Sequence, residues 1–124
     1  MSEVKCSVVA KIFKDQMCYD IIMCLGGDNG EYIATKTIWF QGIPHPQEAE
    51  AYGLKEAIIW LGNRGLPTVS IEFDSKQVAD GISNKISTDS ELGAILNYCK
   101  TLFSSLSNVM IILLCDKQTM WLIC

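Results

Sequence analysis

The chain has 124 residues, of which 49% are hydrophobic and 19% charged, and its net charge is −4. This length fits one domain with one hydrophobic core, and the composition excludes a chain that is disordered throughout. The acidic balance argues against strong nucleic-acid binding, because basic residues that neutralise phosphates supply most of that affinity. No apolar run reaches the roughly 18 residues needed to span a bilayer, so we expect no membrane partner.

The first residues are polar and do not resemble a signal peptide, which predicts an intracellular protein of the nucleus or cytoplasm. The six cysteines contain no CxxC pair, so reduced, buried thiols are expected rather than disulfides. His45 is the single histidine and has no cysteine close to it in sequence, which argues against a zinc site. We expect a monomer.

The first third of the chain predicts three strands, because β-branched, aromatic and apolar residues dominate three segments separated by turn signals. The strands are expected at 6–13, 17–25 and 31–40. The connections between them, at 14–16 and 26–30, are short enough to require an antiparallel meander.

The remaining chain alternates between helical and strand patterns. Pro44 and Pro46 precede a helix that starts near Gln47, and Gly65 followed by Pro67 ends it. The later predicted elements are a strand at 68–73, a short helix capped by Asp74 and Ser75, a helix opened by residues 88–91, and a strand at 109–115. The crossover helices require parallel pairing, so the expected fold is α/β, a mixed five-stranded sheet with helices on its faces.

Two carboxylates stand at positions where they could hold a metal ion. Glu50 lies near the start of the long helix, and Asp74 follows the strand 68–73. Ligands collect at the C-terminal ends of parallel strands, and two carboxylates meeting there would suit a hard cation such as Mg²⁺. A structural explanation competes with this one, because Glu complements a helix N-terminus and Asp caps a helix.

Several segments resemble the plant ribonuclease-H-like domains of the reverse-transcriptase-like, type 1 ribonuclease H family. The helix PQEAEA–GLKEA at 46–57 is similar to the family's "AEA" helix, and IEFDSKQV at 71–78 resembles its "E-x-D-S-x-x-V" turn. KCSV at 5–8 looks like its opening strand. The resemblance implies a ribonuclease-H-like fold that binds nucleic acid and cleaves RNA in RNA–DNA hybrids with Mg²⁺ or Mn²⁺ at four carboxylates.

The resemblance places two of these four carboxylates, Glu50 and Asp74, as catalytic and metal-binding residues. The family's first Asp, in its "V-D-G-A" strand, is replaced by Val9, with Lys11 close by. Valine has no lone pair for a metal. Asp15 and Asp20 are the nearest substitutes, but Asp15 falls in a turn and Asp20 stands where a glycine is common. We therefore expect impaired catalysis and weakened metal binding.

The fourth carboxylate belongs to a motif of the form "R-x-A-N-x-x-A-D/H-x-L-A" that is missing from the end of the chain. We expect residues 1–115 to form the domain and residues 116–124 to be an aberrant tail. Permitted codons for residues 115–124, read in a shifted frame, spell R-Q-A-N-N-V-A-H-L, which resembles the missing motif. The hypothesis is a frame-shifted C-terminus.

Two other interpretations stay open: a non-catalytic interaction domain, and the product of a decaying gene. Three aromatic residues could stack on bases, although core packing is the favoured interpretation. They are Trp39, Phe40 and Trp60.

The frame-shift hypothesis predicts the bases of the coding DNA. Across codons 115–124 these bases should permit the shifted reading R-Q-A-N-N-V-A-H-L. Sequencing that DNA checks the prediction, and codons that cannot be read this way would remove the hypothesis.

Overall fold

The computed structural model describes residues 4–27, 29–65, 68–73, 78 and 90–106 with their side chains, and residues 109–115 and 118–123 through their backbone. The elements follow one another as β1 (Val4–Phe13), a 3₁₀ turn η1 (Lys14–Gln16), β2 (Cys18–Gly26), β3 (Tyr32–Gln41), α1 (Pro46–Arg64), β4 (Val69–Phe73), α3 (Glu91–Ser104), β5 (Val109–Cys115) and β6 (Gln118–Ile123).

The strands form one mixed sheet in the order β3-β2-β1-β4-β5-β6. The β1–β2, β2–β3 and β5–β6 pairs are antiparallel, whereas β1–β4 and β4–β5 are parallel. Each parallel pair is joined through a segment that contains a helix, as a crossover requires. The α/β fold and the meander predicted from the sequence are confirmed.

The sheet has one strand more than predicted. Residues 118–123, which the sequence analysis assigned to an aberrant tail, form β6 and pair with β5 from Cys115↔Gln118 to Met110↔Ile123. Two residues separate the ends of β5 and β6, and so short a connection favours a hairpin. How the tail arose is a separate question, which this pairing does not test.

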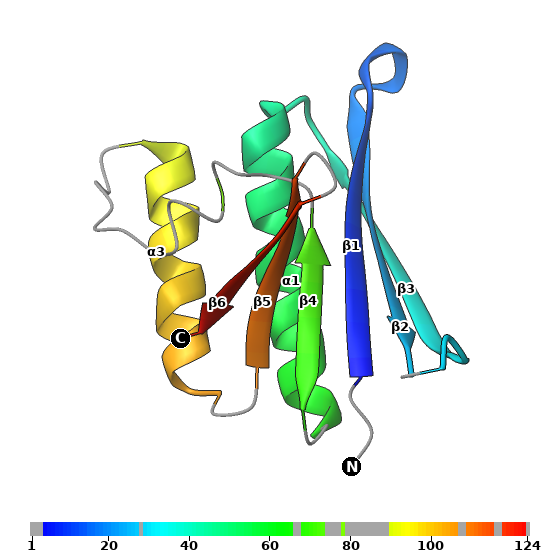
Figure 1. Ribbon diagram of the computed structural model, residues 1–124. Coiled ribbons are helices and arrows are strands. Elements are labelled where there is room, and N and C mark those ends of the chain that lie inside the picture. Colours follow the sequence, from blue (N-terminus) through cyan, green and yellow to red (C-terminus); the bar gives the residue numbers. More distant parts are fainter. Residues whose placement is uncertain are drawn as a thin grey trace.

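Both helices lie on the same face of the sheet (Figure 1). Along β1 the side chains alternate, so that Val4, Cys6 and Val8 are buried while the residues between them are exposed. Gly53 on α1 allows a close approach, because a Cβ there would lie 3.0 Å from Val8 Cγ1. The core therefore fills the space between α1 and the strands β1, β2 and β4.

Local signals fix the ends of the helices. The backbone N–H of His45 donates to Glu48 Oε1 at 3.1 Å, and Pro46 occupies the first helical position of α1. Gly65, with a φ of 64°, takes the left-handed conformation that ends α1. At the start of α3, Ser90 Oγ accepts a hydrogen bond from the backbone N–H of Gly93 at 3.0 Å.

The contact between α1 and α3 includes buried and polar parts. The Cys99 thiol donates to the Ala51 carbonyl oxygen at 3.8 Å, and Phe103 is fully buried. At the first residue of α3, Glu91 Oε1 accepts a hydrogen bond from the Tyr52 hydroxyl. This hydrogen bond, reinforced by burial, raises the pKa of Tyr52 to about 12.

The structure tests part of what the sequence predicts for the cysteines and for the short helix after Asp74. Four cysteines are free thiols, of which Cys6 and Cys99 are buried, Cys18 is half-buried and Cys24 is exposed. The short helix predicted after Asp74 lies outside the described residues except for Val78, which is helical and fully buried. Among the described residues, no helix is long and apolar enough to cross a membrane.

The raised pKa of Tyr52 predicts a loss of stability at high pH. A tyrosine whose pKa is higher in the folded chain stabilises the fold fully below its ordinary pKa of 10.0 and loses that contribution as the pH rises towards 12. Unfolding by urea, measured between pH 9 and 12, should show a shallower decline for Tyr52→Phe than for the wild type. Buried Cys6 and Cys99 leave a residual decline, because their pKa is also raised to about 12.

A matched control is Tyr98→Phe, at an exposed tyrosine of α3. This variant should keep the wild-type slope. Equal slopes for Tyr52→Phe and the wild type would contradict the role of the Tyr52–Glu91 hydrogen bond.

Candidate functional site

Glu50 lies where the sequence predicts, near the N-terminal end of α1. Its neighbours Ala49 and Ala51 are fully buried against the core, whereas Glu50 itself is half-buried. Its carboxylate is therefore carried by a rigid, well-packed helical turn. Because Glu50 is half-buried rather than buried, its carboxylate can stay charged, so the position suits a charged oxygen ligand.

Asp74, the second predicted ligand, lies outside the described residues. The strand that leads to it, β4, ends at Phe73 and points toward the end of the molecule at which α1 begins (Figure 1). The segments that carry Glu50 and Asp74 thus lead to the same end of the fold. Whether the two carboxylates meet there is a prediction that the described residues do not test.

Val9 occupies the central part of the sheet, where the family resemblance implies an aspartate. It lies on β1, between β2 and β4, and its side chain is 49% exposed. Because Val8 faces Gly53 of α1, Val9 points to the opposite face of the sheet. In the parallel β1–β4 pair Ser7 lies opposite Glu72, and Val9 follows two residues after Ser7 on β1.

The two possible substitutes for the missing carboxylate differ in position. Asp15 lies in η1, beyond the end of β1, and is exposed away from the centre of the sheet. Asp20 lies on β2 opposite Lys11, and the neighbouring pair on this face is Val9↔Ile22. Asp20 is therefore a diagonal neighbour of Val9 on the same face, with a lysine directly beside it.

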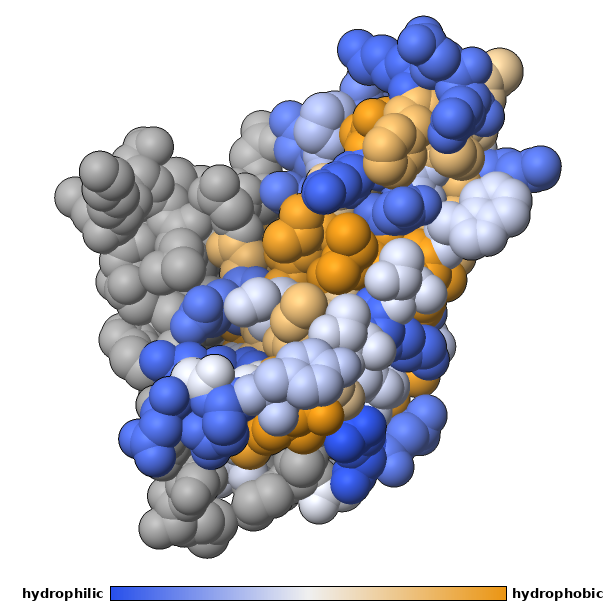
Figure 2. All heavy atoms as spheres, turned by 90° about the vertical axis from the view of Figure 1, so that its right-hand side faces the viewer, coloured by the Kyte–Doolittle hydropathy of each residue, from blue (hydrophilic) through white to orange (hydrophobic). Residues whose placement is uncertain are grey.

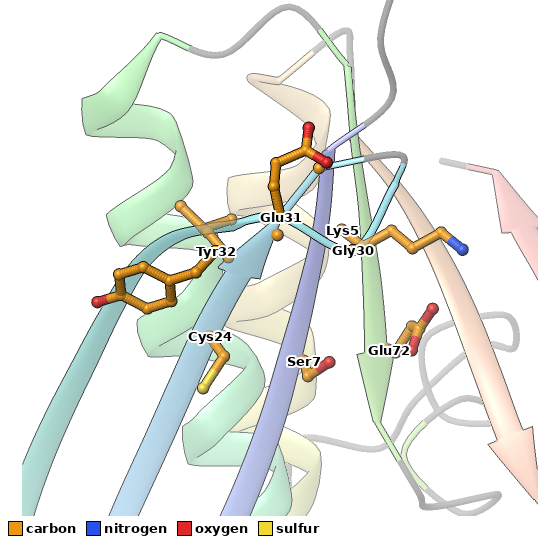
Figure 3. Close-up of a pocket in the computed structure, with 10 residues that line it drawn as sticks. Lys5, Ser7, Cys24, Gly30, Glu31, Tyr32 and Glu72 are labelled. Carbon is orange, nitrogen blue, oxygen red and sulfur yellow. The ribbon is translucent and has the colours of Figure 1, made fainter.

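The described residues contain no group of three or more His, Cys, Asp or Glu side chains that could hold a metal ion. A shallow depression of about 310 Å³ lies on the face of Val9, toward the start of β1. Figure 3 shows the side chains around it, which include Lys5, Ser7, Glu31 and Glu72. This lining carries both signs of charge, so it does not form the basic surface that binds phosphates.

Of the three aromatic residues expected in the core, one is not there. Phe40 is half-buried and stacks on Tyr19 with ring centroids 5.1 Å apart, and Trp60 is half-buried with the Arg64 guanidinium 5.5 Å from its ring centroid. Trp39 is 63% exposed. The expectation of core packing is wrong for Trp39, because β3 is an edge strand and Trp39 points to the face opposite α1.

The hydrogen bond between Tyr52 and Glu91, which joins α1 to α3, was not predicted from the sequence. The two residues are 39 positions apart in the sequence, so no local pattern predicts the contact. The Tyr52 ring also lies 6.4 Å from that of Tyr19, which connects α1 to β2. These contacts fix the turn of α1 that follows Glu50.

The fold and the sequence are similar to known proteins. Residues 20–117 match the profile of the family described as reverse transcriptase-like. Among solved structures, ribonuclease H1 from the halophilic archaeon Halobacterium salinarum is 15% identical, with a TM-score of 0.76 over 92% of this chain and 86% of the other. No curated protein sequence matches the chain significantly.

Two further structures were determined with nucleic acid. LC11-RNase H1, isolated from compost and solved with an RNA/DNA hybrid, is 12% identical, with a TM-score of 0.75 over 92% of this chain and 86% of the other. The foamy viral protease-reverse transcriptase, solved with double-stranded DNA, is 13% identical, with a TM-score of 0.66 over 90% of this chain and 79% of the other. At these identities the likeness shows the fold. The family match covers more than half of the chain, which therefore belongs to the reverse transcriptase-like family and has the fold of type 1 ribonucleases H.

Proposed function

We propose that the chain is a ribonuclease-H-type domain that binds RNA–DNA hybrids and cleaves their RNA strand poorly or not at all. The single observation that carries the proposal is Val9, a half-exposed aliphatic side chain at the centre of a ribonuclease-H-like sheet. The family match begins at residue 20, so it supports the family without including the β1 position in question.

The nucleic-acid partner is supported by the structural relatives. LC11-RNase H1 was solved with an RNA/DNA hybrid and the foamy viral enzyme with double-stranded DNA. The net charge of −4 makes this chain's own electrostatic attraction weak. We infer that any hybrid is held with low affinity, through the shape of the fold and a few local contacts to phosphates that weaken as salt rises.

The residues present do not fit a pair of metal ions. Glu50 and Asp74 could supply oxygen ligands to one Mg²⁺ or Mn²⁺, which would act as a Lewis acid on the phosphate. Val9 supplies no ligand where the central aspartate is expected, and Lys11 adds positive charge to the same face. Two carboxylates leave too few oxygens and too little negative charge for a second ion.

We infer that Asp20 does not replace the carboxylate ligand that is missing at Val9. It is a diagonal neighbour of Val9, but its direct cross-strand partner is Lys11, whose positive charge competes with a metal ion for the same carboxylate. The Val9 position itself is open to repair. At 49% exposure an introduced carboxylate stays hydrated, so Val9→Asp should fold.

The direct test is cleavage of a labelled RNA–DNA hybrid in Mg²⁺ and in Mn²⁺. The wild type should show little or no cleavage. Val9→Asp, combined with a C-terminus that restores the family motif, should gain at least about a hundredfold, since each factor of ten needs only about 1.4 kcal/mol of transition-state stabilisation. The gain should disappear when Glu50→Gln is added.

Val9→Asn is the matched control, because it has the shape of aspartate without its charge, and it should leave cleavage at the wild-type level. Metal-dependent cleavage by the wild type that Glu50→Gln abolishes would show that the site is complete and the proposal wrong. Measurable hybrid binding that weakens as salt rises separates a binding domain from the product of a decaying gene.

A further inference from the structure

The face of the sheet opposite α1, called the open face below, exposes an unusual amount of apolar surface. Along β1, β2 and β3 it consists of every second residue. Within the described part of the chain, no helix covers it (Figure 1). Its members are Lys5, Ser7, Val9, Lys11 and Phe13 on β1, Cys18, Asp20, Ile22 and Cys24 on β2, and Thr35, Thr37, Trp39 and Gln41 on β3.

Several of these side chains are large, apolar and accessible. Val9 is 49%, Phe13 39% and Trp39 63% exposed. Figure 2, which looks at the molecule from the β3 side, shows apolar side chains between hydrophilic ones on that side. On the open face itself Val9 lies beside Ile22, and Trp39 lies beside Asp20. A contiguous patch with a polar rim marks an interaction site more often than a solvated surface.

We propose that the open face packs against the open face of a second copy of this chain. The arrangement of its residues is self-complementary. Lys11 lies opposite Asp20 across the β1–β2 pair, and Val9 lies opposite Ile22 at the adjacent position. A two-fold axis parallel to these strands, midway between them, lays β1 of one copy over β2 of the other.

In that arrangement each Lys11 meets Asp20 of the second copy, and each Val9 meets Ile22 of the second copy. The contact is isologous, as a two-fold dimer requires. Sheets that pack face to face lie about 10 Å apart, and side chains from both sides fill that space. The apolar pairs thus form the centre, and the ion pairs set the relative position of the two copies.

The charge of the open face favours a second copy over nucleic acid. Its members include the cations Lys5 and Lys11 and the anion Asp20, and Glu72 of the adjacent strand β4 lines the same depression as Lys5, so cations and anions are mixed on this side of the sheet. Nucleic acid would need an excess of cations. A second copy needs alternating charges, and these are present.

The size of the open face determines the expected affinity of the dimer. Ten residues of β1 extend about 33 Å, and three strands span roughly 14 Å across. A contact of this size is at the small end of specific interfaces, which predicts a weak, concentration-dependent dimer rather than an obligate one. The dimer replaces the monomer expected from the sequence.

The test is sedimentation velocity of the full chain over a range of concentrations, with circular dichroism as a check of folding. The wild type should form more dimer as its concentration rises. Lys11→Asp and Asp20→Lys each place like charges against each other in both symmetric contacts, and each should weaken the dimer by about tenfold.

Mixing the two variants gives the sharpest result. In a mixed dimer, Asp at position 11 meets Lys at position 20 of the other copy, and the unchanged Asp20 and Lys11 meet as before. An equimolar mixture should therefore recover association to about the wild-type level. An effect confined to each chain, such as altered folding, would not be repaired by mixing.

Tyr98→Lys is the control for a general effect of surface charge, because Tyr98 is an exposed aromatic residue on α3. It should leave the dimer unchanged. A wild type that stays monomeric at all concentrations overturns the proposal. So does a dimer that the Lys11 and Asp20 variants leave intact, which would place the contact elsewhere.

Discussion

The close contact between α1 and β1 is the constraint on which the rest of the structure depends. Gly53 brings the helix so near the strand that a Cβ would lie 3.0 Å from Val8 Cγ1. Because side chains alternate along a strand, Val8 on the helical face places Val9 on the other face. The alternation of side chains along β1 therefore determines which residues of this strand lie in the core and which lie on the open face.

The alternation of side chains along β1 also determines which residues surround Val9. On the open face Val9 has Ile22 opposite it and the Lys11–Asp20 pair beside it. A carboxylate at this position would have supplied the negative charge that a metal needs. Valine instead makes the centre of the face apolar. In the proposed function Val9 leaves the site without a metal ligand, and in the proposed dimer the same side chain lies at the centre of the contact.

The elements could be predicted from the sequence because their signals are local. The Gly-rich turn at 26–30 and the short segment Lys14–Gln16 fixed the meander, and Gly65 marked the end of α1. β6 was missed because residues 118–123 were interpreted as a foreign tail, although a two-residue connection to β5 favours pairing.

Features that depend on tertiary position could not be predicted in the same way. Trp39 is exposed because it lies on the face of the sheet that no described helix covers, and no property of β3 itself reveals which face that is. The Tyr52–Glu91 hydrogen bond requires α3 to pack on α1. The position of Glu50 was predicted because a motif placed it on α1, whereas its meeting with Asp74 stays a prediction.

In the proposed function, Val9 leaves the carboxylate site unable to hold a catalytic metal. Titration of Mn²⁺ into the chain, followed by the paramagnetic resonance of the free ion, measures this without relying on activity. We expect weak binding by the wild type, binding at least about tenfold tighter by Val9→Asp, and loss of that gain when Glu50→Gln is added. Tight binding by the wild type that Glu50→Gln abolishes would contradict it.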